Sequence, residues 1–590
     1  MQALAHGEVV QRRCDSSAAG ITLACVAAGL PMLLAFNLPP SATYFNQAAC
    51  LLGWGAWALR LAGSSARTPL SRMEVAAYVT LGLLFVVLVL QPALGAQPWA
   101  LALSGAALVA SALVVAALGG MALRNGLGGS VFLALCVAFL IAGLASCVIG
   151  MIQVYAPTWP DGDLIARSSI VGRSVGNLRQ PNHLCSLLLW SIVAALWLGE
   201  AQLLRRALGI AFAGLMLFVV VLSGSRSGVL GALLLALWGL LDTRLAKSTR
   251  AALLLAPIAY ALFWSGATTW APLGEHAFGG VGRFGTSGDI SSSRFGIWSN
   301  TLDLIRAQPW AGVGFGEFNF AWTLTEFPNR PVAFFDHTHN LPLQFAIELG
   351  LPLAVLALAL LGWALWRAAR NCMLPPGPEV SPQRAAFVMV LLVLMHSLLE
   401  YPLWYAYFLL PAAFALGLCL ASPSRHEGAV APASRKPGQA MSLRIGALVL
   451  LLGAAYSIYD YFKVVVIFAP PENAAPLSER IARGQRSVFF SHHADYAAAT
   501  TSEDPVLALA AAGRAAHYLL DTRLMMAWAN ALHATGDSER AKYLAQRLRE
   551  FRNPQSVGYF APCDDPAVAR ADKPYQCFAP QRQFAFADFR

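Results

Sequence analysis

The sequence predicts an all-α integral membrane protein made of many spanning helices. Of its 590 residues, 57% are hydrophobic and only 12% are charged, whereas about 25% charged residues is typical of a soluble domain. The hydrophobic residues also form repeated long runs, and one spanning helix needs about 20 predominantly apolar residues. These two observations exclude an ordinary soluble enzyme.

About thirteen spans are expected, and several are short enough that the two near 208–241 could instead form one re-entrant pair. The expected spans lie near 19–38, 48–63, 74–91, 99–120, 131–152, 184–199, 208–222, 227–241, 251–268, 342–366, 385–400, 403–421 and 444–466. They divide the chain into N-terminal membrane helices (1–130), a membrane core (131–421) with a long loop at 269–340, an inner loop with the last span (422–466), and a C-terminal domain (467–590).

The charges between the spans predict the orientation. If the N-terminus is cytoplasmic, the short inner loops carry eighteen Arg and Lys residues, against eight in the outer loops. Positive residues favour the cytoplasmic side, so the loop 269–340 and the C-terminal domain are expected outside, in a periplasm if the cell is Gram-negative. The net charge of +10 then reflects the excess of basic residues in the cytoplasmic loops. No basic face with interleaved aromatic residues is present to indicate nucleic-acid binding.

The C-terminal domain shows helical periodicity over Pro505–Leu519 and Asp521–Phe551, with a break at Gly536-Asp537. This pattern is typical of one tetratricopeptide-type unit, which falls short of an array. We expect a helical domain for capping or for docking a partner. Cys563 and Cys577 are the one pair placed to form a disulfide in an oxidising compartment, and the sequence leaves that bond open.

Polar residues from five separate segments are expected at the outer edge of the membrane. Unsatisfied polar groups cost several kcal/mol there, so such a group indicates function. Arginine suits phosphate because its planar guanidinium donates two hydrogen bonds at once and stays charged. The segments carry Arg173 with Gln180 and Asn182, Arg226 within Ser223–Ser227, Arg283 and Arg294, His337 with His339 and Asn340, and Glu400 with Tyr405.

Structural explanations compete with functional ones at several of these positions. Arg226 could reach the membrane interface with no other role, Arg179 is expected to be an ordinary loop charge, and Tyr405 could belong to an aromatic belt. The spacing of His337 and His339, between Asp336 and Asn340, favours function. No metal ligand motif is present, so no metal and no cofactor are predicted.

These motifs resemble a known family. His339-Asn340, nine residues, and then Gly350 is similar to the histidine signature of the O-antigen ligase superfamily. Within it, Gly172-Arg173-Ser174 with Gln180-Pro181-Asn182-His183, and His396–Tyr405, are most like the PglL-type bacterial protein O-oligosaccharyltransferases. Leu353 departs from the small residue or tyrosine that family ligases often carry at that position, which leaves the acceptor class open.

The resemblance implies a GT-C-type helical bundle in the bacterial inner membrane, with its active site facing the periplasm. It also implies transfer of a preassembled glycan from undecaprenyl pyrophosphate to Ser or Thr of exported proteins such as pilins, with inversion and without a metal. Histidine can accept a hydroxyl proton near neutral pH, and arginines can stabilise a departing pyrophosphate. The catalytic assignments are His339, Arg226 and Arg294. Arg173, Gln180, Asn182, Arg283, His337, Asn340, Glu400 and Tyr405 are assigned to substrate binding.

Two other functions compete with this one. An O-antigen ligase acting on lipid A–core, or a Wzy-type polymerase, would differ only in the acceptor. A flippase for lipid-linked sugars would also need many spans, but it should carry charge deep within its helices, whereas these residues are expected at one edge.

Overall fold

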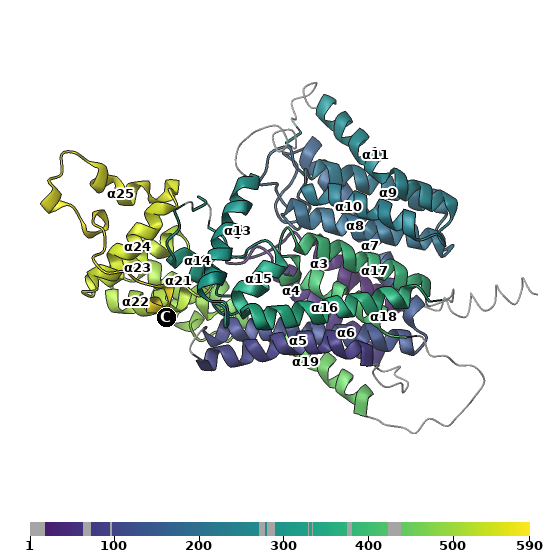
Figure 1. Ribbon diagram of the computed structural model, residues 1–590, viewed down its shortest axis with the longest axis horizontal. Coiled ribbons are helices and arrows are strands. Elements are labelled where there is room, and N and C mark those ends of the chain that lie inside the picture. Colours follow the sequence, from purple (N-terminus) through teal and green to yellow (C-terminus); the bar gives the residue numbers. More distant parts are fainter. Residues whose placement is uncertain are drawn as a thin grey trace, which may run out of the picture. The chain divides into compact units, whose positions relative to one another are not determined.

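The computed structural model describes residues 18–62, 72–94, 97–270, 278–279, 290–328, 330–332, 334–374, 380–422 and 438–590, and Figure 1 shows their helices. Within these residues the chain is all-helical. It divides into two compact units, the first comprising 1–81, 110–287 and 360–455, and the second 82–109, 288–359 and 456–590. The prediction of an all-α protein is confirmed.

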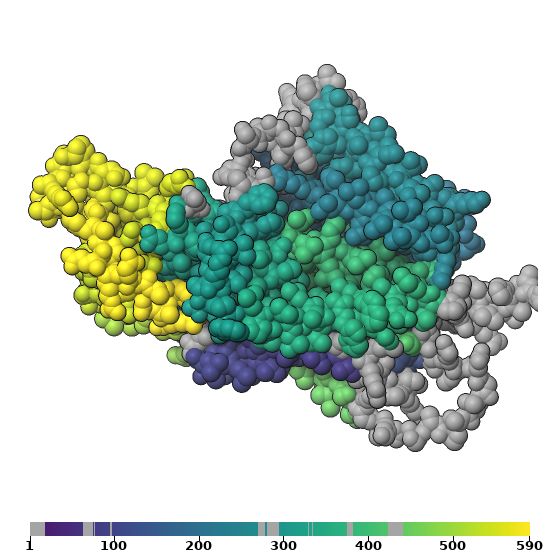
Figure 2. Space-filling model, viewed as in Figure 1, coloured from purple at the N-terminus to yellow at the C-terminus, as the bar shows by residue number. Residues whose placement is uncertain are grey.

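The first unit is a bundle of apolar helices in which α8 packs against α7, α9 and α17, and α10 against α11. Figure 2 shows α9 to α11, in blue-teal, as one continuous stretch of surface. The helices of this unit are α2 (Ala18–Ala24), η1 (Cys25–Gly29), α3 (Leu30–Leu33), α4 (Tyr44–Ala62), α7 (Gly128–Tyr155), α8 (Pro181–Glu200), α9 (Arg206–Leu222), α10 (Arg226–Leu241), α11 (Lys247–Trp270), α17 (Val380–Ser397), η4 (Pro402–Trp404) and α18 (Ala406–Leu420).

The second unit combines short helices with the C-terminal tail. Its elements are η2 (Gln91–Leu94), α13 (Ile290–Ala307), α14 (Phe318–Leu324), α15 (Leu341–Leu349), α20 (Leu477–Gly484), α21 (Ser491–Thr501), α22 (Pro505–Ala515), α23 (Thr522–Ala534), α24 (Ser538–Glu550), η5 (Pro554–Ser556), α25 (Val557–Asp564), η6 (Arg570–Asp572), η7 (Tyr575–Cys577) and η8 (Phe586–Phe589). Four long helices, α5 (Arg72–Leu90), α6 (Trp99–Arg124), α16 (Leu351–Cys372) and α19 (Gly438–Phe468), contribute residues to both units.

Seven helices in the described part of the chain are long and apolar enough to cross a membrane, which indicates a membrane protein. They are Ala77–Leu94, Trp99–Arg124, Gly128–Tyr155, Pro181–Glu200, Lys247–Thr269, Leu351–Cys372 and Met441–Phe468. The remaining expected spans coincide with helices that are shorter or less apolar, so the count of thirteen stays a prediction.

One expected span is wrong in its bounds. The predicted span 342–366 is two helices, because α15 ends at Leu349 and α16 begins at Leu351. Gly350 between them has a φ of +76°, which only glycine adopts readily. Its missing side chain also matters, since a Cβ atom there would lie 2.2 Å from the carbonyl oxygen of Trp310. The sequence does not predict this turn, because apolar residues such as leucine and alanine continue on both sides of Gly350.

The tail consists of helical hairpins, with α21 packed on α22 and α23 packed on α24. Asp521 and Asp537 cap the starts of α23 and α24, since their carboxylates accept from the backbone N–H groups of Leu524 and Arg540. Gly536, with a φ of +96°, lies in the turn between these two helices. The predicted break at Gly536-Asp537 is therefore confirmed, and the tetratricopeptide resemblance stays a prediction.

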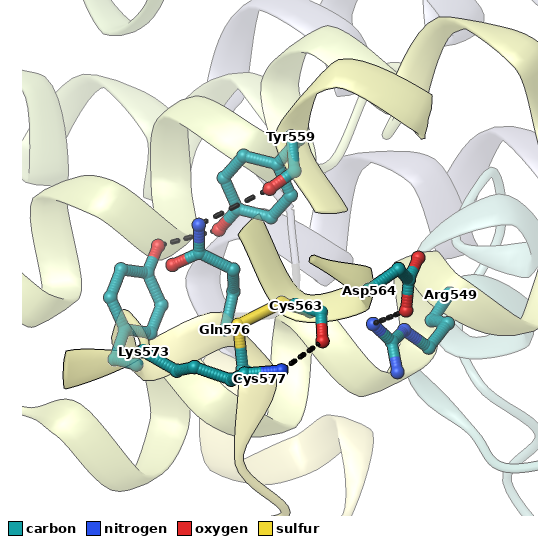
Figure 3. The surroundings of a disulfide bond; sticks show 8 residues. Arg549, Tyr559, Cys563, Asp564, Lys573, Gln576 and Cys577 are labelled. Atoms are coloured by element: carbon teal, nitrogen blue, oxygen red, sulfur yellow. Dashed lines mark hydrogen bonds and ion pairs between the residues drawn. A yellow bond between two sulfur atoms is a disulfide. The ribbon is translucent and has the colours of Figure 1, made fainter. Parts of the chain in front are cut away.

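A disulfide joins Cys563 to Cys577 in the tail and closes a loop of 14 residues (Figure 3). The ammonium group of Lys573 donates to the carbonyl oxygen of Cys563, and the phenol groups of Tyr559 and Tyr575 lie 2.6 Å apart. The structure thus settles the pairing that the sequence leaves open.

Candidate active site

The residues predicted for the site fall into two groups, one in each unit. Arg173, Gln180, Asn182, Arg226, Glu400 and Tyr405 lie in the first unit, whereas Arg294, His337, His339 and Asn340 lie in the second. Arg283 lies outside the described residues. We call the first group, with Ser223 and Ser225, the amide–arginine cluster, and residues 335–340 the histidine segment.

Asn182 is the centre of the amide–arginine cluster. Its Nδ2 donates to Oε1 of Glu400 over 2.9 Å, and its Oδ1 accepts from the hydroxyl of Ser225 over 2.6 Å. Ser225 is the residue before α10, so Arg226 occupies the first position of that helix and is only partly buried. The side-chain amide of Asn182, at the start of α8, thus links the start of α10 to the segment after α17.

Arg173 is bound at the break between α9, which ends at Leu222, and α10, which begins at Arg226. Its side chain is buried, and its Nε donates over 2.8 Å to the carbonyl oxygen of Ser223. The backbone N–H of Ser174 also donates to the carbonyl oxygen of Leu222. The loop that carries Arg173 is thus bonded to Leu222 and Ser223, four and three residues before Arg226. The structure thus brings Arg173 and Arg226 to the same break between α9 and α10.

Gln180 and Tyr405 join this cluster through His183. The side-chain oxygen of Gln180 accepts from the backbone N–H of His183 and so caps α8. The rings of His183 and Tyr405 lie 4.6 Å apart, edge to face, and the phenol of Tyr407 lies 3.2 Å from Nδ1 of His183. His183 belongs to one of the family-like motifs, but no role is predicted for it. Its position in the first turn of α8, directly after Asn182, was the signal that could have found it.

Arg179 behaves as the sequence analysis expects. Its Nη2 donates over 3.3 Å to the carbonyl oxygen of Gly162, within the same outer loop. Burial of the side chain lowers the pKa of Arg179, and the nearby Asp163 offsets part of that shift. The side-chain hydrogen bond of Arg179 thus stays within its own loop, as expected of a loop charge.

The histidine segment leads directly into α15, and the two ends of that helix carry the His-Asn…Gly pattern. Asn340 caps the start, because its Oδ1 accepts over 3.1 Å from the backbone N–H of Leu343. Gly350 ends the helix. His339, immediately before the cap, has a φ of +55°, a left-handed conformation that is uncommon for histidine. The spacing of the pattern is therefore the length of one nine-residue helix.

His337 and Asp336 form a close pair, with 3.2 Å between Nδ1 and Oδ2. Desolvation would raise the pKa of Asp336, but the charges of His337 and His339 and the bond to His337 outweigh it and lower that pKa to about 2. Asp336 is therefore a fixed negative charge beside both imidazoles at every physiological pH, and it can orient His337 through Nδ1.

Arg294 lies one helical turn before the residue that binds the histidine segment. Trp298 of α13 donates from its indole Nε1 to the carbonyl oxygen of Thr338 over 2.9 Å. Residues four apart lie on the same helix face, and α13 packs against α15. Arg294 therefore lies on the same face of α13 as Trp298, the residue that binds the histidine segment.

The tail of the chain holds the histidine segment through α14. Asn319 is 3% exposed; its Nδ2 donates to the carbonyl oxygen of Phe335 and its Oδ1 accepts from the backbone N–H of Leu520. Arg330 is buried, and its Nε lies 3.1 Å from a carboxylate oxygen of Glu550. Asn319 and Arg330 are not predicted as site residues, because nothing local in the sequence shows that α14 and the tail would share one core.

A buried carboxyl group lies in α15, outside the candidate spans. Glu348 is 2% exposed, and its Oε1 accepts over 2.8 Å from Nε2 of Gln344. Burial raises the pKa of Glu348 to about 8, although the bonds from Gln344 and from the backbone of Gly316 and Phe318 lower it in part. Gln344 in turn accepts from the backbone N–H of Thr338. Gln344 therefore connects the buried Glu348 to Thr338 in the histidine segment.

Comparisons with known proteins match these regions. Residues 211–358 match the family described as O-antigen ligase, residues 175–198 match the family described as protein glycosylation ligase, and residues 385–555 match the C-terminal part of the virulence factor membrane-bound polymerase family. The three ranges contain His339 and Gly350, then Gln180 to His183, and then Glu400 and Tyr405. The resemblance to the O-antigen ligase superfamily is thereby confirmed.

Two curated proteins of Acinetobacter baylyi are also similar to this chain. A general O-oligosaccharyltransferase is 29% identical over 269 residues, which are 44% of this chain and 46% of the relative. A ComP-specific O-oligosaccharyltransferase is 27% identical over 257 residues, 42% of this chain and 44% of the relative. The chain thus matches less than half the length of each of these relatives.

Proposed function

We propose that this chain is a membrane oligosaccharyltransferase that moves a preassembled glycan from a lipid pyrophosphate carrier to Ser or Thr hydroxyls of exported proteins. The observation that carries the proposal is the histidine segment: His339 sits in a left-handed conformation directly before the Asn340 cap of α15. The similarity to two O-oligosaccharyltransferases supports the same reaction.

In this proposal His339 accepts the proton of the acceptor hydroxyl. A Ser or Thr hydroxyl is a weak nucleophile near neutral pH, and an imidazole is suited to take its proton during attack. The oxygen then forms a bond to the anomeric carbon as the bond from that carbon to the carrier pyrophosphate breaks. Direct attack of this kind inverts the anomeric configuration.

Arg173, Arg226 and Arg294 stabilise the negative charge that builds on the departing pyrophosphate. Arg226 stands at the N-terminus of a sixteen-residue helix, where backbone N–H groups and the helix dipole also favour an anion. Asn182, Gln180, Glu400 and Tyr405 would orient the sugar, and His337 and Asn340 the acceptor. The carrier is proposed to be undecaprenyl pyrophosphate, and the acceptors to be pilin-like proteins in a periplasm.

Glycan transfer by the purified full-length protein tests the proposal. Lipid-linked oligosaccharide is supplied with either a Ser/Thr-containing acceptor protein or a lipid A–core acceptor, and products are analysed by mass spectrometry. A glycosylated Ser or Thr with the inverted linkage is expected. Exclusive modification of lipid A–core would replace this function by that of a ligase. Movement of the lipid-linked glycan across a vesicle membrane without any transfer would replace it by that of a flippase.

A further inference from the structure

A cavity of about 350 Å³ lies in the first unit between α10, α16 and α17, within the size range of small-molecule sites. Its walls are mostly apolar and include Leu237 and Leu241 of α10, Phe387 and Leu391 of α17, and Met373. Leu237 is 50% exposed, and Leu241 and Met373 are more exposed still. The cavity is therefore an apolar recess that opens to the surroundings of the helices.

The recess is distinct from the amide–arginine cluster. Arg226 is the first residue of α10, whereas Leu241, which lines the recess, is the last. Fifteen residue steps of α-helix separate them by about 22 Å. By the charge of the loops, this end of α10 is the predicted cytoplasmic end.

Three charged side chains line one end of the recess. Arg384 Nε lies 2.8 Å from Oδ2 of Asp242, so these two charges offset one another. Arg244 is exposed, and it donates to the carbonyl oxygens of Met373 and Leu374 at the end of α16. The charged end of the recess thus carries one net positive charge, which Arg244 supplies.

Hydrogen bonds join the end of α16, next to the recess, to two neighbouring segments. Asn371 of α16 donates from its Nδ2 to the carbonyl oxygens of Cys419 and Leu420, at the end of α18. Arg244 joins the segment after α10 to the end of α16. Its own two bonds to the carbonyl oxygens of Met373 and Leu374 hold the Arg244 guanidinium in place beside the apolar walls.

We propose that this recess binds an anionic phospholipid, with an acyl chain against the apolar walls and the phosphate beside Arg244. A guanidinium stays charged and is a preferred protein partner of phosphate. It has five N–H groups, so Arg244 keeps three for a phosphate beyond its two bonds to carbonyl oxygens. The apolar walls require an amphiphile, since a free phosphate would leave them exposed. Phospholipids with anionic headgroups are the abundant negatively charged amphiphiles of a cytoplasmic leaflet. Because the recess lies at the predicted cytoplasmic end of α10, an anionic phospholipid is the occupant.

Lipid titration of the full-length protein, followed by native mass spectrometry, tests this proposal. Phosphatidylglycerol is expected to bind at least about tenfold more tightly than phosphatidylcholine, a difference of about 1.4 kcal/mol. Arg244→Ala should remove that preference, and Leu237→Trp, which fills the recess, should weaken the binding of both lipids. Arg205→Ala is the matched control, because Arg205 is an exposed arginine before α9 that does not line the recess.

Each other result would overturn the proposal. Equal binding of the two lipids, or an Arg244→Ala variant that binds like Arg205→Ala, would reduce the recess to a site of unselective acyl-chain contact. Competition by inorganic phosphate alone would make it a simple anion site, and preferential occupancy by undecaprenyl phosphate would make it a site for the carrier lipid. Thermal unfolding of the lipid-free variants serves as the folding control and should match that of the wild type.

Discussion

The side-chain amide of Asn319 donates a hydrogen bond of 2.9 Å to the carbonyl oxygen of Phe335, the residue at which the histidine segment begins. The same amide accepts from the backbone N–H of Leu520 in the tail. One buried side chain therefore connects the C-terminal helices to the segment that carries His339. This contact gives the tail a role in positioning the site, in addition to any role in binding partners.

Asn319→Asp is expected to lower the turnover rate more than it lowers the acceptor affinity. A carboxylate still accepts from Leu520 but cannot donate to Phe335, so the partly buried carbonyl of Phe335 loses its partner at a cost of about 1 kcal/mol. Turnover number and acceptor KM of the purified enzyme measure the effect. Asn530→Ala is the control, since Asn530 accepts from Tyr575 elsewhere in the tail. A change in KM alone would contradict a positioning role.

His339→Ala is expected to abolish visible glycan transfer while expression and membrane insertion stay normal. General-base help is worth about 10²–10⁴-fold in rate, and His339 lies in a partly exposed loop before α15. His337→Ala should be milder, because His337 is paired with Asp336 and lies two residues further from the α15 cap. Single-turnover rates with defined lipid-linked substrate measure both. Near-normal turnover by His339→Ala would rule out its assignment as the base.

Arg226→Lys is expected to lose most of the activity although the charge is kept. A lysine ammonium cannot reproduce two parallel hydrogen bonds to a phosphate group. Arg179→Lys is the matched control, because Arg179 also lies beside the first-unit cluster in sequence but binds a loop carbonyl oxygen. Initial rates of transfer at saturating acceptor compare the two variants. Equal effects would show that the two arginines have been wrongly assigned to different roles.

Glu348→Gln is expected to flatten the pH dependence of stability between about pH 4.5 and about pH 8. The pKa of Glu348 is raised to about 8 in the folded protein by burial, so the folded state keeps a proton that the unfolded state has already lost. Stability therefore falls as pH rises through this window, by at most about 1.4 kcal/mol per pH unit, and the full contribution is present below about pH 4.5. Thermal unfolding midpoints of wild type and variant across pH 5 to 8 measure the difference; parallel curves would contradict it.

The sequence predicts the helices and the local motifs well, because both depend on residues close together in the chain. Apolar runs mark the helices, and the His339–Gly350 spacing is set by the length of α15 alone. The break at Gly350 was missed, since its cause is the carbonyl of Trp310, forty residues earlier. The roles of Asn319 and Arg330 were missed for the same reason, because each binds tail residues about 200 positions away.

Cys563→Ser is expected to destabilise the tail and to leave the membrane helices of the first unit folded. A disulfide that closes a loop of this size, 14 residues, contributes about 3 kcal/mol by limiting the unfolded chain. The loss should be local, because the bonded segment packs on α24 and α25 within the second unit. Limited proteolysis of the purified protein should then cut the variant after about Asn553 at lower protease concentration than the wild type. The wild type treated with a reductant is the matched control and should give the same fragments. A variant as resistant as the oxidised wild type would show that the hydrogen bonds of Lys573 and Tyr575 hold this loop without the disulfide.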